Sequence, residues 1–180
     1  MKGKKAQVFS GELFLAYIFF TLVLVVVVYL WGNAIKNIFE SEDNSDLEGA
    51  AVDVSENLVR TPGMPELWNK TSVKTVGLAN RSRNLNEAKL LDFVDLMNPN
   101  EYSNTCGSDI SNYDCNKHLT GVGVYDFHFS LEYLNGSTVS INEQAITTGK
   151  QPVGETKKIP ITRTSLLNET IVHAKVVVWR

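Results

Sequence analysis

The pattern of apolar and polar positions divides the chain into two parts. From Leu13 to Trp31 no residue is charged. These roughly 19 positions would span about 28 Å as a helix, which matches the hydrocarbon core of a bilayer. Such a helix is apolar on every face, so we expect it to be buried in lipid or among other helices. The remaining part, about 140 to 150 residues long, is polar and suffices for one compact core.

A second helical pattern follows the apolar segment. Between positions 47 and 58, apolar residues recur at steps of three and four: Leu47, Ala50, Ala51, Val54 and Leu58. Gly49 predicts a kink or a short break in this helix. Pro62, Gly63 and Pro65 predict its end, because proline and glycine stop helices.

A short second helix is predicted from Asn86 to Met97. Pro99 closes it, and its apolar face consists of Leu90, Leu91, Val94 and Met97. We expect this helix to pack on a sheet.

From Gly121 onward the period changes to two. Alternate residues from Tyr125 to Tyr133 are apolar or aromatic, which predicts a half-buried strand. Asn135-Gly136 predicts a hairpin turn, with Ser137 to Ile146 as the returning strand. A further strand is predicted near Lys158 to Ser165. The last strand would turn Val172, Ala174, Val176 and Val178 inward.

These elements together predict an α+β fold. Four strands in sequence favour an antiparallel meander with one face to cover. The amphipathic stripe from Leu47 to Leu58 and the short helix are the natural covers. The predicted architecture is a long N-terminal apolar helix that leads into a helix-backed antiparallel sheet.

Composition restricts the possible functions of the chain but does not identify one. The chain has 180 residues and a formal net charge of −3, so no basic excess suggests contact with nucleic acid. Cys106 and Cys115 are the two cysteines, and outside the cell they would close a small disulfide loop. Free thiols are the alternative. Their spacing does not fit a zinc site.

Catalytic and metal-binding patterns are weak in this sequence. His118 lies between the cysteines and the first strand, while His128 and His173 would become neighbours only if their strands pair. An acidic patch, formed by Glu42, Asn44, Asp46 and Glu48, fails the calcium-loop pattern because Leu47 replaces the required glycine. No phosphate loop, G-x-S-x-G or H-E-x-x-H occurs. We therefore expect neither enzyme activity nor a cofactor.

Charges around the apolar segment predict its orientation. Lys2, Lys4 and Lys5 precede it, and acidic residues follow it, which places the N-terminus in the cytoplasm. A secretory signal cut near Gly32-Asn33-Ala34 is one interpretation, although its apolar core is longer than usual. An uncut signal anchor is a second interpretation.

The residues just before the apolar segment support a third interpretation. Lys4, Lys5, Ala6, Gln7, Ser10 and Glu12 form a lysine-rich leader followed by Gln, Ser and an acidic residue. This stretch resembles the class III signal peptide of archaeal type IV pilin-like proteins. The resemblance implies cleavage by a prepilin peptidase between Ala6 and Gln7. Ser10 and Glu12 lie one position further from this cut than in the common pattern, so a cut before Val8 stays open.

The resemblance implies a domain organisation and a function. Residues 1–6 would be the leader, residues 7–60 the long helix with its membrane-spanning segment 13–31, and residues 61–180 an extracellular head. The protein would be a major or minor pilin that is held in membrane lipid before it polymerises with other pilin subunits into an adhesive cell-surface filament. The alternative is a single-pass, membrane-anchored binding or sensory module that does not polymerise.

Glu12 has a physical role in this interpretation. A carboxylate drawn into hydrocarbon costs about 2.5 to 3.5 kcal/mol at a helix centre and less near the interface. Cleavage would create a cationic α-amine nearby, on the same subunit or a neighbour, that could pair with Glu12 during assembly. Alternatively, Glu12 sits among the lipid head groups.

Four N-x-S/T sequons are glycosylation candidates on an exported chain, at Asn69, Asn80, Asn135 and Asn168. Asn135 has an alternative explanation in the turn geometry alone.

Overall fold

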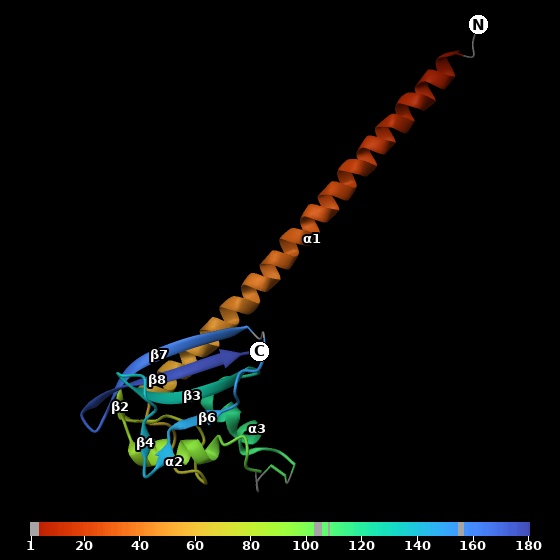
Figure 1. The fold of residues 1–180 in the computed structure, drawn as a ribbon. Helices are drawn as coiled ribbons and strands as arrows, with labels where there is room; N and C mark the ends of the chain where they lie inside the picture. Colours follow the sequence, from red (N-terminus) through yellow and green to blue (C-terminus); the bar gives the residue numbers. More distant parts are fainter. Residues whose placement is uncertain (1–3, 103–105, 108, 155–156) are drawn as a thin grey trace. The chain divides into compact units, whose positions relative to one another are not determined.

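The protein is described by a computed structural model that covers residues 4–102, 106–107, 109–154 and 157–180, without the side chains of residues 4–10 and 39–41. It comprises two compact units, Met1–Asn44 and Ser45–Arg180. The first unit is helical, and the second holds the sheet and all other elements (Figure 1). The α+β class expected from the sequence is confirmed.

Helix α1 extends from Lys4 to Arg60 without interruption. The break expected at Gly49 is therefore wrong. Gly49 is exposed on the helix surface, where a glycine lowers helix stability without ending the helix. The end at Arg60 agrees with the end predicted from Pro62, Gly63 and Pro65.

Backbone donors from later segments bind carbonyls of the last turn of α1, and the Lys89 side chain binds the segment that follows it. Leu58 O accepts from Leu78 N, and Val59 O accepts from Arg83 N, each at 2.8 Å. Lys89 is 4% exposed, and its Nζ donates to Pro62 O at 2.7 Å and to Ala79 O at 3.1 Å. Burial lowers the pKa of Lys89, while the charge of Glu66 opposes this shift. These contacts fix the helix end in the core of the second unit.

The apolar stripe of α1 belongs to this core. Leu47, Ala51, Val54 and Leu58 are at most 2% exposed, as the sequence predicts, whereas Ala50 of the predicted stripe is only partly buried. Helix α2 (Glu87–Leu96) begins at Asn86, whose side chain accepts from Lys89 N. Its bounds agree with the predicted short helix, and its apolar face also includes the buried Phe93.

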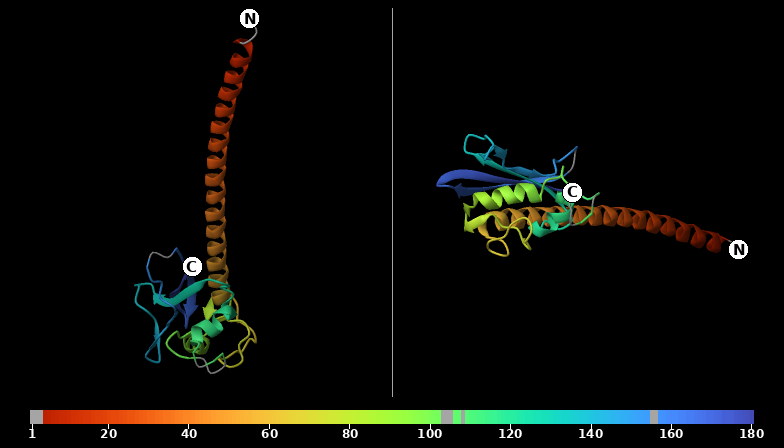
Figure 2. Two further views of the ribbon diagram at one scale, coloured as in Figure 1. Left: turned by 90° about the vertical axis from the view of Figure 1, so that its right-hand side faces the viewer. Right: turned by 90° about the horizontal axis from the view of Figure 1, so that it is seen from below.

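One face of the sheet is covered by the last turns of α1 and by α2, which lie on the same side in Figure 2. On the α1 side, Arg163 Nε lies 3.2 Å from Glu56 Oε1. On the α2 side, the Phe93 ring contacts Phe127 and Phe129, with centroids 6.4 and 5.3 Å apart. The sheet is therefore helix-backed, as expected.

The strand order corrects the predicted meander. Six strands pair in the order β1-β2-β7-β8-β3-β6. They are β1 (Ala79–Arg81), β2 (Asn84–Leu85), β3 (Asp126–Tyr133), β6 (Thr147–Gly149), β7 (Lys158–Leu167) and β8 (Thr170–Trp179). The last strand, β8, pairs antiparallel with both β3 and β7, so it lies in the interior of the sheet. Its inward residues Val172, Ala174, Val176 and Val178 are fully buried, as predicted.

The returning strand expected from Ser137 to Ile146 forms only in part. The turn at Asn135-Gly136 exists, with Gly136 N donating to Tyr133 O at 2.9 Å. After it, the chain forms a separate two-stranded hairpin from β4 (Ser140–Ile141) and β5 (Gln144–Ala145). Asn142 and Glu143 form its turn with positive φ angles of 51° and 67°. On either side of this hairpin the chain pairs with β3: Thr138 forms a bridge with Glu132, Val139 N donates to Leu131 O at 2.8 Å, and β6 pairs along β3.

The segment between α2 and β3 holds two short helices, α3 (Asn112–Asn116) and the 3-10 helix η1 (Lys117–Thr120). Tyr113 of α3 is fully buried, and its hydroxyl accepts from Phe127 N at 2.7 Å. This bond joins the segment to the start of the sheet.

Candidate functional site

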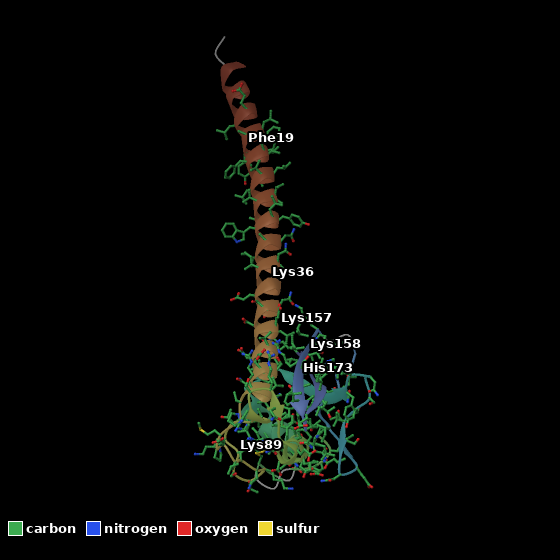
Figure 3. The ribbon with its side chains drawn as sticks, turned by 90° about the vertical axis from the view of Figure 1, so that its left-hand side faces the viewer. Phe19, Lys36, Lys89, Lys157, Lys158 and His173 are labelled. Carbon is green, nitrogen blue, oxygen red and sulfur yellow. A yellow bond between two sulfur atoms is a disulfide. The ribbon has the colours of Figure 1, made fainter. Side chains whose placement is uncertain are left out.

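The uncharged segment of α1 is the feature that most sharply separates this chain from an ordinary globular protein. Its most apolar window has a mean hydropathy of 2.9, and no residue of that window is buried. Phe19 and Trp31 are 66% and 67% exposed, and side chains project on all sides of the helix around Phe19 (Figure 3). The described residues contain this one helix that is long and apolar enough to span a membrane.

The polar side chains of this segment are placed so that they can tolerate an apolar environment. Thr21 Oγ1 donates to Tyr17 O at 2.8 Å, so its hydroxyl is bonded within the helix. Tyr29 and Trp31 lie at the C-terminal end, where amphipathic rings favour a membrane interface. The segment can therefore enter lipid, or a bundle of similar helices, without an unpaired side-chain hydroxyl at Thr21.

Glu12 lies at the N-terminal end of the segment and is exposed. No charged residue lies between it and Lys36. The side chains of Ala6 and Gln7, the expected cleavage site, lie outside the described residues, although both residues belong to α1.

The two cysteines form the expected disulfide. Cys106 and Cys115 are bonded, with their Cα atoms 5.9 Å apart. Cys115 lies in α3, so the bond links the preceding loop to this helix. The free-thiol alternative is thereby excluded.

The candidate glycosylation sites are all exposed, but their side chains differ in hydrogen bonding. Asn69 Oδ1 accepts from the hydroxyl of Thr71 at 2.8 Å, and Asn135 Oδ1 accepts from the hydroxyl of Ser137 at 2.7 Å. In both, the acceptor is the amide oxygen. Asn168 differs, because its Nδ2 donates to Glu87 Oε1 at 2.6 Å. A sugar on Asn168 would take one of the two hydrogens of this nitrogen.

The fourth candidate, Asn80, lies in β1. Its Oδ1 accepts from Asn86 Nδ2 at 2.7 Å, which connects it to the residue that caps α2.

The histidines do not form a common site. Strands β3 and β8 do pair, but His173 lies opposite Glu132, whereas His128 lies opposite Val177. The two positions are four residues apart along β8, which is about 13 Å. His118 lies in η1. A site built from His128 and His173 is therefore not formed.

The acidic patch is likewise a set of surface residues. Glu42, Asn44, Asp46 and Glu48 are all exposed on α1. Among the residues that the structure describes, no group of three or more His, Cys, Asp or Glu side chains could hold a metal ion.

One pocket of the head was not foreseen from the sequence. A cavity of about 520 Å³ lies between the end of α2 and the strands β3 and β6. His128, Thr147 and Gln151 line it together with Asn98 and Asn100. These residues form no sequence motif, because the fold brings them together from separate segments. The alternating pattern of β3 predicted only that His128 lies on the outer face.

Comparisons with known proteins identify no relative: no family model, no curated protein and no solved structure matches the chain. Function must therefore be inferred from the residues and their arrangement.

Proposed function

We propose that this chain is a structural subunit of a type IV pilus-like surface filament, made as a precursor and trimmed by a prepilin peptidase near Gln7. The observation that carries the proposal is the combination of an uncharged, exposed helical segment with the Lys-Gln-Ser-Glu cluster directly before it. A signal peptide cut after the apolar core would discard this helix. Cleavage before the core retains it for assembly.

The arrangement of the elements is compatible with such a subunit. The apolar segment would lie in membrane lipid first and then among the same segments of other subunits. The second unit would be exported and would face the cell exterior, where Cys106–Cys115 would persist as a disulfide. Glycans on the exposed sequons would also lie on that side.

Glu12 supplies the assembly contact in this proposal. Its carboxylate would pair with the α-amine that cleavage creates on a neighbouring subunit. Pairing in a low-dielectric environment is far stronger than in water, so it would favour one axial register between subunits.

The first experiment measures processing. The protein is isolated from its native membranes, and its intact mass is compared with that of the full chain. We expect a mass that lacks residues 1–6, or residues 1–7 if the cut falls before Val8. A native protein that retains Met1 to Ala6 would sink the processing claim.

The second experiment separates a filament subunit from a membrane-anchored module. Glu12→Gln removes the charge at nearly constant size, and Glu12→Asp retains it. We expect Glu12→Gln to insert into the membrane normally and to lose filaments, while Glu12→Asp retains some. Absence of filaments from the wild type and from both variants would favour the module that never polymerises, and equal filaments from all three would show that Glu12 is not the assembly contact.

A further inference from the structure

The pocket beside His128 is formed by three separate segments of the head. Val94 and Asn98 come from the end of α2 and the turn after it, His128 comes from β3, and Thr147 comes from β6. Gln151 and Val153 follow β6 on the chain. A volume of about 520 Å³ falls within the range of small-molecule sites in proteins.

Gly149 allows these segments to approach closely. Its φ angle is +91°, and a Cβ atom there would lie 2.4 Å from Phe127 O. Only glycine fits this position. Next to it, Thr148 is 5% exposed, and its hydroxyl donates to Val94 O at 3.2 Å. The floor of the pocket is therefore held by contacts between β6, β3 and α2.

The His128 ring lies within hydrogen-bonding distance of two polar side chains of the pocket. Gln151 Nε2 lies 3.3 Å from His128 Nε2 and 3.5 Å from His128 Nδ1, and this amide nitrogen is a donor. Thr147 Oγ1 lies 3.2 Å from His128 Nε2. Burial lowers the pKa of His128, hydrogen bonds with the backbone of Gly149 and Lys150 oppose this shift, and the positive charge of Lys175 on β8 adds to it.

The lysine that borders the pocket is already neutralised. Lys150 Nζ lies 2.7 Å from Asp114 Oδ1 and 3.8 Å from Asp126 Oδ2. It also lies 5.2 Å from the centre of the Tyr113 ring. No carboxylate lines the pocket among the residues that the structure describes. A charged ligand would therefore find no free counter-charge there.

Neutral donors and acceptors remain available in the pocket. Asn98 Oδ1 accepts from Asn100 N at 3.0 Å, which leaves its amide NH₂ group as a donor. Gln151 uses its NH₂ group on His128, which leaves its amide oxygen as an acceptor. Val153 is 79% exposed and adds an apolar surface beside these groups, together with Pro99.

We propose that this pocket binds a neutral sugar residue through the amides of Asn98 and Gln151. Vicinal hydroxyls donate and accept at once, which complements an amide NH₂ group beside an amide oxygen. The C–H face of a sugar ring suits the apolar surface of Val153 and Pro99. This inference concerns the second unit alone and does not depend on leader cleavage or polymerisation.

The test uses the full chain in a detergent that has no sugar head group. Saturation-transfer NMR is recorded with neutral hexoses and N-acetylhexosamines at millimolar concentration. Glucuronate serves as the charged counterpart, and an uncharged tripeptide represents a peptide ligand. We expect transfer to at least one neutral sugar, and less transfer to glucuronate.

Three variants locate the binding. Gln151→Ala and Asn98→Ala each remove one hydrogen bond, so we expect each to weaken binding by about fivefold. Asn57→Ala removes an exposed amide of α1 outside the pocket and should bind as the wild type does. Unchanged circular dichroism spectra show that the variants fold.

Three outcomes overturn the proposal. The first is no transfer to any neutral sugar. The second is equal transfer in all three variants, which would place binding elsewhere. The third is transfer to the tripeptide alone, which would assign the pocket to peptides.

Discussion

Two buried serines of the second unit, Ser55 and Ser165, differ in whether their hydroxyl groups have hydrogen-bond partners. Ser55 on α1 donates to Val52 O at 2.8 Å and accepts from Arg163 Nε at 3.2 Å. Ser165 on β7 is 2% exposed, and among the described residues its hydroxyl has no hydrogen-bond partner. A buried polar group without a partner costs about 1 to 3 kcal/mol.

We therefore expect alanine to have opposite effects at the two positions. Ser165→Ala should raise the free energy of unfolding by about 1 kcal/mol, and Ser55→Ala should lower it by about 1 kcal/mol. Urea unfolding of the full chain in detergent, followed by tryptophan fluorescence, measures both. A loss of stability in both variants would show that Ser165 has a partner in solution.

His128 should make the stability of the head depend on pH. Because burial lowers its pKa below the ordinary 6.5, the unfolded chain binds a proton more readily than the folded chain in the window between the two values. The free energy of unfolding should therefore rise with pH through this window and fall as the pH drops below 6.5. The stabilising contribution is fully present above 6.5.

The measurement compares unfolding free energies of the wild type and His128→Gln between pH 5 and pH 7.5, a range that brackets an ordinary histidine. We expect a shallower pH dependence in His128→Gln. His118→Gln removes an exposed imidazole from η1 and is the control that leaves the His128 contribution in place. Equal slopes in the wild type and His128→Gln would contradict the assignment.

At the scale of elements, the sequence predicted which segments are helices or strands better than it predicted which strands pair. Periodicity located α2, β3, β7 and β8, because each carries a regular apolar face. Periodicity did not predict that β8 lies between β7 and β3, because it shows which face of a strand is buried and not which strands pair with it. One signal was present: Pro160 lies in β7 and cannot donate to a ladder, which indicates an edge strand.

The free side of β7 explains this proline. Leu166 N donates to Arg83 O, on the side of β7 that faces away from β8. The backbone N–H positions of alternate residues point to the same side of a strand, so the nitrogen of residue 160 also faces away from β8. Among the described strands, β2 alone pairs on that side, and only at Leu166. A proline and Lys158 at an open edge hinder pairing with another chain.

We expect Pro160→Thr to promote self-association, because it adds an N–H group and a β-branched side chain to the open edge. Sedimentation velocity in detergent should show dimers or larger species at protein concentrations where the wild type sediments as one species. Pro152→Thr, outside the strands, is the matched control. If both variants sediment as the wild type does, Pro160 does not protect the edge.

At the scale of the whole molecule, the compact second unit begins at Ser45 rather than after the end of α1. Leu47, Val54 and Leu58 complete its core. Burial of such side chains contributes about 1.5 to 3 kcal/mol each, and their sum approaches the total stability of a typical domain.

A chain that starts at Ser45 should therefore fold on its own, whereas one that starts at Thr61 should not. Amide proton dispersion in NMR spectra distinguishes the two. A dispersed spectrum from residues 61–180 would show that the α1 stripe is dispensable. Neither the pocket residues nor this boundary could be predicted from the sequence, because both depend on which segments the tertiary fold brings together.

The apolar segment should direct the chain to the membrane whether or not filaments form. Leu22 and Ile38 are both exposed apolar residues of α1, at 58% and 63%, but Leu22 lies at the middle of the uncharged segment and Ile38 lies beyond Trp31. Lysine at the centre of a spanning helix costs about 2.5 to 3.5 kcal/mol on insertion scales.

We expect Leu22→Lys to reduce the membrane-integrated fraction after alkaline extraction by at least about tenfold, since 1.4 kcal/mol corresponds to one order of magnitude. Ile38→Lys should remain integrated, because its ammonium group can stay in water. If the two variants partition alike, the helix is not held in lipid through this segment. The pair thus separates membrane insertion from polymerisation, which the Glu12 variants test independently.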